Sequence, residues 1–454
     1  MNDLVALPGA DKATVIERDQ HTISRKHISP NALKALYALR DAGYHAFLVG
    51  GGVRDLLLGS SPKDFDIATD ATPEDLKREF RNARIIGRRF KIVHLRYGRE
   101  IIEVTTFRAH HDQQNEIADD VSRRQIRNLD SAHSTGGMLL RDNVYGTIDE
   151  DALRRDFTVN ALYYTIDGFR VLDFCGGLDD LAERQIRMIG DPRERYKEDP
   201  VRMLRAIRFA AKLDFDIEPA TAAPIDELSH LLESISPARL FDETIKLFTN
   251  GYSQDTFALL RQYRLGQYLF APTFEVLDRL PADDPASELI ELALENTDDR
   301  LYEGKSVTPA FLFAALLWPV LQQHIRNRPE DEAGALFTIQ QAADSVIMEQ
   351  LQYTAIPKRF TATTKEIWEL QARLEKRNRR GAEAVFGHPR FRAAYDFLLL
   401  REDAGEDLQG LGDWWTEYQV ANAERQLEMT NAFTTPDKKR KRRRRRSKSP
   451  GTAQ

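Results

Sequence analysis

A glycine triplet between two apolar segments constrains this chain most, because it separates a strand from a helix within a few residues. Residues 44–49 (YHAFLV) predict a buried strand, Gly50-Gly51-Gly52 a turn, and residues 53–58 a short helix that ends at Gly59. Residues 64–69 (DFDIAT) predict a second strand. This order of elements predicts a mixed α/β sheet rather than an all-helical or all-β domain.

The pattern changes from mixed to helical along the chain. The further elements expected in the first part are a helix from Ser29-Pro30 to Gly43, a helix from Thr72-Pro73, and strands at 91–97 and 100–107. Residues 1–28 are expected to be loosely ordered. Residues 109–140 are polar and aperiodic, which is typical of a mobile loop or an insertion. From about residue 151 to Leu400 the periodicity is helical, so the sequence predicts an α+β fold with helical domains after the sheet.

Composition limits the classes of protein to which the chain can belong. Its 454 residues, 42% hydrophobic and 30% charged, are typical of a soluble globular protein with several domains. The longest apolar stretch, residues 310–321, is interrupted by Pro319 and is shorter than the roughly 20 residues that a membrane helix needs, so it is expected to form a buried helix. The N-terminus lacks the apolar run of a secretory signal, so we expect a cytoplasmic protein. One cysteine, Cys175, allows neither an intrachain disulfide nor a cysteine zinc site, so any metal must lie on carboxylates.

The charge is concentrated at the C-terminus. Residues 438–448 hold ten basic residues and no acid, and without them 55 basic residues remain against 71 acidic ones. Because a run of like charge cannot bury apolar surface, residues 433–454 are expected to be disordered. The tail could simply aid solubility. The acidic remainder already provides solubility, however, which favours an arm that binds polyanions.

Two acids in the second strand suggest a metal site. Residues two apart on a strand point to the same face, so Asp64 and Asp66 project together while Phe65 and Ile67 enter the core. Two like charges repel unless a cation lies between them, and oxygen ligands favour Mg²⁺. Two solvated acids at a surface strand are the alternative, and a lone DxD pair fits that alternative well.

Two further features surround this pair. The glycine turn could bring backbone amides and Arg54 close to phosphates, although a simple tight turn explains it equally well. It lacks the Gly-Lys-Ser/Thr of a Walker loop, and Asp55 occupies the third glycine position of the dinucleotide fingerprint. Glu103 lies in an otherwise apolar strand, where an acid is costly to bury without a partner. It could face the DxD pair or lie on an exposed strand face.

Four motifs together resemble the nucleotidyltransferase superfamily, in the class shared by bacterial poly(A) polymerases and CCA-adding enzymes. They are LVGGGVRDLLLG with KDFDIAT, RRDFTVNAL at 154–162, LDFCGGLDDL at 172–181 and EDPVRMLRAIRF at 198–209. They follow the order of the family and extend over residues 47–215. The resemblance implies a catalytic nucleotidyltransferase head at 29–170, a helical neck at 171–240 that binds the base and RNA, and a helical RNA-binding body at 241–432.

The resemblance also implies a mechanism, which is two-metal phosphoryl transfer. Asp64 and Asp66 are then the Mg²⁺ ligands, Glu103 aligns with the third carboxylate, and Asp156 belongs to the active site. The residues implied for nucleotide binding are Gly51, Gly52, Arg54, Arg155, Asp199, Arg202, Arg205 and Arg208. An RNA 3′-hydroxyl attacks the α-phosphate of ATP in this chemistry, so no histidine or serine triad is needed.

The segment that starts at Glu198 suggests how the base is chosen. Arg202, Arg205 and Arg208 recur every three residues along a helix and span about 120° of it. Asp199 before Pro200 is typical of an N-cap, and an arginine stripe is usually a solvated face. In the related enzymes, however, the Asp and Arg of this element contact the base edge. An Asp acceptor and an Arg donor match N6 and N1 of adenine.

Other segments bear on poly(A) against CCA addition. Residues 85–94 (IIGRRFKIVH) resemble the segment that sets bacterial poly(A) polymerases apart, and residues 355–360 and 388–401 and the basic tail also resemble those enzymes. We therefore expect template-independent addition of AMP from ATP to RNA 3′ ends, which promotes RNA turnover. The alternatives are CCA addition to tRNA and a catalytically silent RNA-binding protein. The expected partners are RNA 3′ ends, ATP, and RNA-decay or RNA-chaperone proteins.

Overall fold

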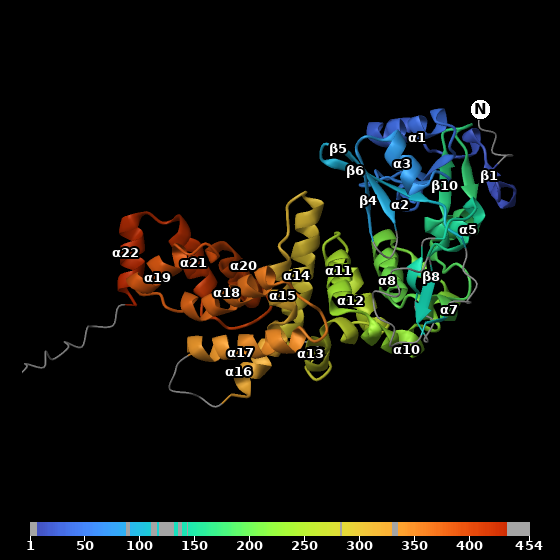
Figure 1. The fold of residues 1–454 in the computed structure, drawn as a ribbon. Coiled ribbons are helices and arrows are strands. Elements are labelled where there is room, and N and C mark those ends of the chain that lie inside the picture. Colours follow the sequence, from blue (N-terminus) through green and yellow to red (C-terminus); the bar gives the residue numbers. More distant parts are fainter. Residues whose placement is uncertain are drawn as a thin grey trace, which may run out of the picture. The chain divides into compact units, whose positions relative to one another are not determined.

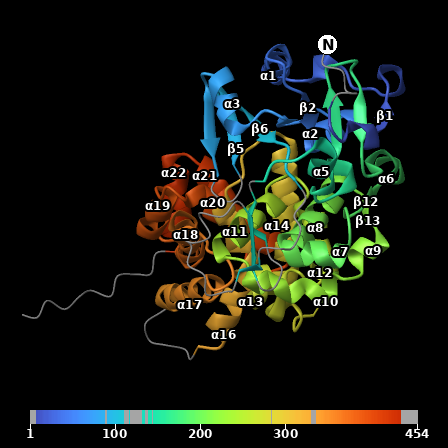
Figure 2. The same ribbon diagram turned by 45° about the vertical axis from the view of Figure 1, so that its right-hand side comes forward.

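The computed structural model describes most of the chain as two compact units (Figures 1 and 2). The described residues are 7–87, 91–109, 116–117, 131–134, 139–142, 144–281, 284–328 and 335–433. Unit 1 comprises Met1–Phe274, Thr297–Ser306 and Leu351–Ala355, and unit 2 comprises Glu275–Asn296, Val307–Gln350 and Ile356–Gln454. Within the described ranges, no helix is both long and apolar enough to span a membrane.

Unit 1 is built on an eight-stranded mixed sheet with the order β1-β11-β10-β2-β3-β6-β5-β4. Its strands are β1 Thr14–Ile16, β2 Ala46–Val49, β3 Asp66–Thr69, β4 Ala83–Ile86, β5 Ile92–Tyr97, β6 Glu100–Thr106, β10 Leu162–Thr165 and β11 Val171–Asp173. Strands β3 and β6 pair in parallel, whereas the other neighbours in this sheet pair antiparallel. This parallel pair brings together two strands that are separated by β4 and β5 in the sequence.

Helices cover the sheet and then continue the chain. In unit 1 they are α1 Pro30–Asp41, α2 Gly51–Leu57, α3 Pro73–Glu79, α5 Ile148–Leu153, α6 Gly177–Glu183, α7 Pro192–Glu198, α8 Val201–Leu213, α9 Pro219–Ala222, α10 Ile225–Leu228, α11 Pro237–Phe248 and α12 Ser253–Gln262. Ser29 caps α1 by accepting from two backbone amides, and Thr72 and Asp75 form a capping box on α3, so the two predicted helix starts are confirmed.

The two faces of the sheet pack differently. Helix α1 contacts β2 and β3, and α3 contacts β4 and β5. The opposite face buries a cluster that joins the sheet to α5 and the N-terminal segment: Leu7, Ala10, Phe47, Val49, Ala68, Phe107, Ile148, Ala152, Tyr163 and Leu172. Two smaller sheets lie apart from the main one: β12 Gln185–Ile186 with β13 Asp216–Ile217, and β7 Glu116–Ile117 with β8 Ser131–Ser134 and β9 Leu139–Asp142.

Unit 2 is helical over its described residues. The helices α13 Gln267–Leu277 and α14 Pro285–Tyr302 contribute residues to both units, and those that follow are α15 Pro309–Leu316, α16 Trp318–Arg326, α17 Ala335–Gln350, α18 Lys358–Leu374, α19 Arg379–Phe386, α20 Phe391–Asp403, α21 Leu411–Val420 and α22 Ala423–Asn431. A buried cluster around Trp415, Leu374 and Tyr418 packs α18 against α21. The predicted α+β fold, with a mixed sheet followed by helices, is confirmed.

Three local expectations are wrong. The chain is not mainly helical directly after residue 151, because β10 and β11 extend the sheet to Asp173. The sequence was misleading here because a short apolar run fits a strand as well as a buried helix. Residues 7–28 are not loosely ordered, since β1 pairs with β11 and Ile23 and Ile28 are buried. Residues 310–321 form two helices that meet at Leu317, where Trp318-Pro319 begins α16. Parts of the segments 85–94 and 109–140, and nearly all of the tail, lie outside the described residues.

Candidate active site

Two of the predicted carboxylates, Asp66 and Glu103, lie in one row of side chains across the sheet. Paired residues on neighbouring strands point to the same face. The row runs through Leu172, Tyr163, Val49, Asp66, Glu103, His94 and Arg84. Its members on β11, β10 and β2 are buried, whereas those on β3, β6, β5 and β4 are all ionisable residues. The parallel pairing of β3 with β6 therefore places Glu103 directly beside Asp66.

Asp64 lies two residues before Asp66, outside the strand. The predicted strand started at Asp64, whereas β3 begins at Asp66. Asp64 is exposed and Asp66 half-buried, while Phe65 and Ile67 are buried, so the expected alternation holds. Burial raises the pKa of Asp66 to about 6, Glu103 and Asp64 also raise it, and Arg155 opposes them. The site therefore carries an excess of negative charge at neutral pH.

The glycine turn lies next to these acids. Gly50 has φ 71° and ψ −141°, a conformation open almost only to glycine. A Cβ atom on Gly50 would lie 4.0 Å from Asp66 Oδ2 and 3.6 Å from Arg155 Nη1. A Cβ on Gly52 would lie 3.4 Å from the backbone oxygen of Asp64. These distances are ordinary van der Waals contacts, so glycine is required at Gly50 by its positive φ rather than by close approach. The predicted turn is shorter than expected, because Gly51 and Gly52 already form the first turn of α2.

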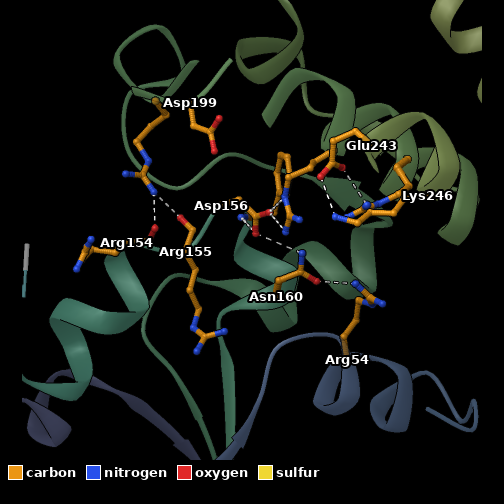
Figure 3. Close-up of polar contacts among 12 residues, drawn as sticks. Arg54, Arg154, Arg155, Asp156, Asn160, Asp199, Glu243 and Lys246 are labelled. Carbon is orange, nitrogen blue, oxygen red and sulfur yellow. Dashed lines mark hydrogen bonds and ion pairs between the residues drawn. The ribbon is translucent and has the colours of Figure 1, made fainter. Parts of the chain in front are cut away.

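Arg54 is part of a buried network in the structure. Its side chain is 1% exposed and donates to Asn160 Oδ1 at 2.5 Å and to Asp55 Oδ1 at 2.9 Å. Its guanidinium carbon lies 5.3 Å from the centre of the Phe209 ring on α8. Arg54 thus links α2 to α8, and Figure 3 shows its hydrogen bond to Asn160. Its predicted contact with a nucleotide stays a prediction.

Arg155 and Asp156 point to different partners although they are adjacent. Arg155 Nε donates to the Tyr163 hydroxyl at 2.8 Å, and its Nη2 donates to Asp151 Oδ2 at 3.1 Å. Asp156 Oδ2 accepts from Arg205 Nε at 2.6 Å. Burial alone would raise the pKa of Asp156, but Arg205 and the Phe157 backbone amide lower it to about 2. Asp156 is therefore an ionised anchor for α8.

The arginines of α8 do not form a solvated stripe. Arg202 donates to the backbone oxygen of Arg195 and to Glu198, both at 2.7 Å. Arg208 donates to the buried Glu243 of α11 at 3.3 Å. With Arg205 bound to Asp156, all three arginines have acidic partners. The helix thus holds its charged face inside the unit, while Leu204, Ile207 and Ala211 fill the core as expected.

The predicted N-cap role of Asp199 is wrong. Pro200 occupies the N-cap position of α8 with helical dihedrals, and Asp199 lies at the C-cap of α7. A proline fixes φ near −65°, so it can adopt helical geometry one residue earlier than expected. Asp199 Oδ2 instead accepts from Arg239 Nη2 of α11 at 2.7 Å.

A crowded set of arginines lies beside Arg155. Burial, together with the charges of Arg108, Arg195 and Arg202, lowers the pKa of Arg154 to about 9. Burial and Arg202 likewise lower the pKa of Arg195 to about 10. Arg195 Nη2 donates to the backbone oxygens of Arg154 at 2.7 Å and Arg155 at 2.6 Å, as Figure 3 shows. This concentration of positive charge suits a polyanion.

Several members of the network were missed from sequence. Asn160 connects Arg54 to Asp156 and lies inside the RRDFTVNAL motif, which was its available signal. Arg239 and Glu243 are four residues apart on α11, so the sequence could have predicted that they share a face of the helix. It could not have predicted their partners, Asp199 and Arg208. His94 contacts Glu103, and no local pattern indicated it.

These features together define a nucleotidyltransferase. The fold resembles the Bacillus stearothermophilus CCA-adding enzyme in complex with CTP, with a TM-score of 0.54, 24% identity, and 89% of this chain and 82% of that chain covered. It also resembles the Thermotoga maritima CCA-adding enzyme complexed with tRNA, with a TM-score of 0.54, 19% identity and coverages of 92% and 98%. At these identities the likeness concerns the fold.

Sequence comparison identifies the particular family. Residues 46–187 match the model of the Poly A polymerase head domain, 214–277 the probable RNA and SrmB-binding site of polymerase A, and 332–449 the polymerase A arginine-rich C-terminus. Poly(A) polymerase I of Escherichia coli O157:H7 is 49% identical over 425 residues, which cover 92% of this chain and 89% of that protein. The Haemophilus influenzae protein of that name is 44% identical, with coverages of 91% and 90%. The chain belongs to the bacterial poly(A) polymerase I family.

CCA-adding enzymes match a smaller part of the chain. The CCA-adding enzyme of Lactobacillus helveticus is 36% identical over 252 residues, which cover 55% of this chain and 58% of that enzyme. The predicted kinship with both groups is confirmed. The two groups differ in how much of this chain they match, 92% for the Escherichia coli O157:H7 poly(A) polymerase I and 55% for this CCA-adding enzyme.

Proposed function

We propose that this chain adds AMP from ATP to RNA 3′ ends without a template and releases pyrophosphate. The observation that carries the proposal is the convergence of Asp64, Asp66 and Glu103 beside the Gly50 turn and Arg155. Negative ligands and a phosphate-compatible turn at one point are what nucleotidyl transfer requires. Loss of either would have favoured a silent RNA-binding protein, and both are intact.

We propose Mg²⁺ as the cofactor, in the two-metal arrangement of the family. The donor set consists of carboxylate oxygens, and their repulsion, visible in the raised pKa of Asp66, is what a cation would relieve. Among the described side chains no group of three or more His, Cys, Asp or Glu already has the geometry of a metal site. Asp64 and Asp66 would hold the metal, which when bound lowers the pKa of the RNA 3′-hydroxyl and neutralises charge on the leaving pyrophosphate.

The other residues would bind and orient the reactants. Arg155 lies close enough to Asp66 to lower its pKa, and the positive potential of Arg154 and Arg195 nearby would attract the triphosphate. The 3′ oxygen forms a bond to the α-phosphorus while the bond from that phosphorus to the pyrophosphate oxygen breaks. Asp156, ionised and paired with Arg205, would hold α8 in a fixed position beside the reacting groups.

Base selection would fall to Asp199 and Arg202. Both are held in place by neighbours, Asp199 by Arg239 and Arg202 by Glu198. A held acceptor and a held donor match N6 and N1 of adenine without needing a template. Arg205 and Arg208 would support this surface from the same helix.

Poly(A) addition is favoured over CCA addition by the extent of the match. The Poly(A) polymerase I proteins of Escherichia coli O157:H7 and Haemophilus influenzae match 92% and 91% of the chain, whereas the CCA-adding enzyme of Lactobacillus helveticus matches 55%. The RNA-binding neck and body, a role in RNA turnover and contacts with RNA-decay or RNA-chaperone proteins stay predictions from the resemblance. The cytoplasmic location stays a prediction from the N-terminal sequence.

An extension assay tests the proposal. The full chain is incubated with end-labelled RNA, Mg²⁺ and one nucleoside triphosphate at a time, with EDTA as the metal control. Long tails with ATP alone support poly(A) addition. A short addition from CTP and ATP, restricted to tRNA ends, would show CCA addition instead, and no extension of any RNA would leave only RNA binding.

A further inference from the structure

His94 lies beside the third carboxylate of the site. It belongs to β5 and is paired in register with Glu103 of β6. Its Nε2 is 3.1 Å from Glu103 Oε1. The side chain of His94 is 21% exposed and that of Glu103 is 46% exposed, so the contact is shielded on one side and open on the other.

Glu103 lies between His94 on β5 and a second acid, Asp66, on β3. Asp66 is its register partner on β3, so two carboxylates lie side by side on neighbouring strands. The backbone fixes the Cα of Glu103, but three side-chain torsions separate its carboxylate from that Cα. Like-charge repulsion would turn a half-exposed glutamate towards solvent and away from Asp66.

We propose that His94 is a positioning residue that holds the Glu103 carboxylate in the active site. It donates a hydrogen bond from Nε2–H to Oε1 and keeps the charged group within the row that contains Asp66. The inference rests on the proposed function, in which Glu103 is the third acid. His94 acts through Glu103 and not on the substrate.

The first experiment compares three variants in the extension assay, with ATP varied at saturating RNA. His94→Leu removes the donor, and His94→Gln keeps a donor at nearly the same place. His45→Leu is the matched control, because His45 also pairs with an acid in this unit, Asp70 at 2.8 Å. His45 lies just before β2, at the end of that strand away from Gly50 and Asp66.

We expect His94→Leu to lower kcat about tenfold or more, with little change in KM for ATP, because the loss affects orientation and not nucleotide binding. His94→Gln should restore most of kcat, and His45→Leu should resemble the wild type. A wild-type kcat in His94→Leu, or equal losses in the Gln and Leu variants, would overturn the inference. If the wild-type chain itself extends no RNA, the proposed function fails instead.

The second experiment measures the contact without activity. Urea unfolding midpoints are compared, in EDTA, for the wild type, His94→Leu, Glu103→Ala and the double variant. Since His94 acts through Glu103, His94→Leu should shift the midpoint in the wild type but not in the Glu103→Ala background. Equal shifts in both backgrounds would mean that the contact does not form in solution. The same curves show whether each variant folds cooperatively.

Discussion

Asp66 and Asp156, both predicted for the active site, have opposite pKa shifts. Asp66 has like charges beside it, which together with burial raise its pKa to about 6. Asp156 is bound to Arg205, and its pKa falls to about 2 despite burial. A bound cation would therefore stabilise ionised Asp66, whereas Arg205 already stabilises ionised Asp156.

Replacing Asp66 with Asn should abolish RNA extension yet stabilise the metal-free protein. The pKa of Asp66 in the folded state lies above the ordinary 3.8, so its ionisation destabilises the fold. The free energy of unfolding should therefore fall progressively as pH rises from about 4 to 6. The variant should therefore gain on the order of 1–3 kcal/mol at neutral pH and almost nothing at about pH 4. Urea unfolding in EDTA at both pH values measures this. A variant that extends RNA normally would contradict the site.

Replacing Asp156 with Asn should have the opposite effect on stability. Its folded-state pKa lies below 3.8, so its contribution is present above about pH 4 and is lost as pH falls towards 2. Because Arg205 is partly exposed, we expect a loss of ~1–3 kcal/mol at neutral pH rather than the full cost of a buried unpaired charge. Urea unfolding of both proteins at neutral pH gives the difference. A stability equal to that of the wild type would mean that the ion pair adds nothing.

The turn that precedes α2 is the element on which the geometry of the site depends most. Gly50→Ala should destabilise the fold by ~1–3 kcal/mol, because φ 71° with ψ −141° is nearly closed to alanine. It should also lower the extension rate, because the backbone that must shift adjoins Asp66 and Arg155. Gly59→Ala is the control, since Gly59 also has positive φ, 74°, but nothing lies within 4 Å of its added Cβ. Thermal unfolding and extension rates are measured for both. Equal losses of activity would show that strain alone, not the position, matters.

Helix α8 carries the proposed base-reading surface. Arg202→Ala should relax discrimination against CTP, GTP and UTP, because a charged donor to a base edge contributes about 1–3 kcal/mol. The ratios of kcat/KM for the four nucleotides measure it. Lys212→Ala, on the same helix but bound to Asp55, is the control and should keep the ATP preference. An unchanged preference in Arg202→Ala would leave this arginine with a structural role only.

At the scale of the whole molecule, the basic tail offers a separable prediction. Deleting residues 437–454 should leave AMP transfer almost unchanged but weaken RNA binding, because each lost phosphate contact removes roughly 0.7 from the slope of log affinity against log salt. The KM for RNA should rise and that for ATP should not. Binding and extension across a salt series compare the two proteins. Parallel salt slopes would show that the tail does not contact RNA.

Local patterns in the sequence determined a definite part of this protein. The glycine turn, the alternation of acids with Phe65 and Ile67, the starts of α1 and α3 and the core face of α8 follow from neighbours within a few residues. Dihedral preferences, caps and periodicity act over that range, so these features were predictable. The four motifs and their order identified the family.

Contacts between distant segments decided the rest. Glu103 meets Asp66 because β6 lies beside β3 in parallel, and the separate antiparallel register of β5 with β6 places His94 next to Glu103. Likewise Asp156 and Arg205 are 49 residues apart, and Asp199 and Arg239 are 40 apart. Strand order and helix packing arise from burial of surfaces that no local window contains, so the sequence supplied the charged groups and only the tertiary structure decided how they pair.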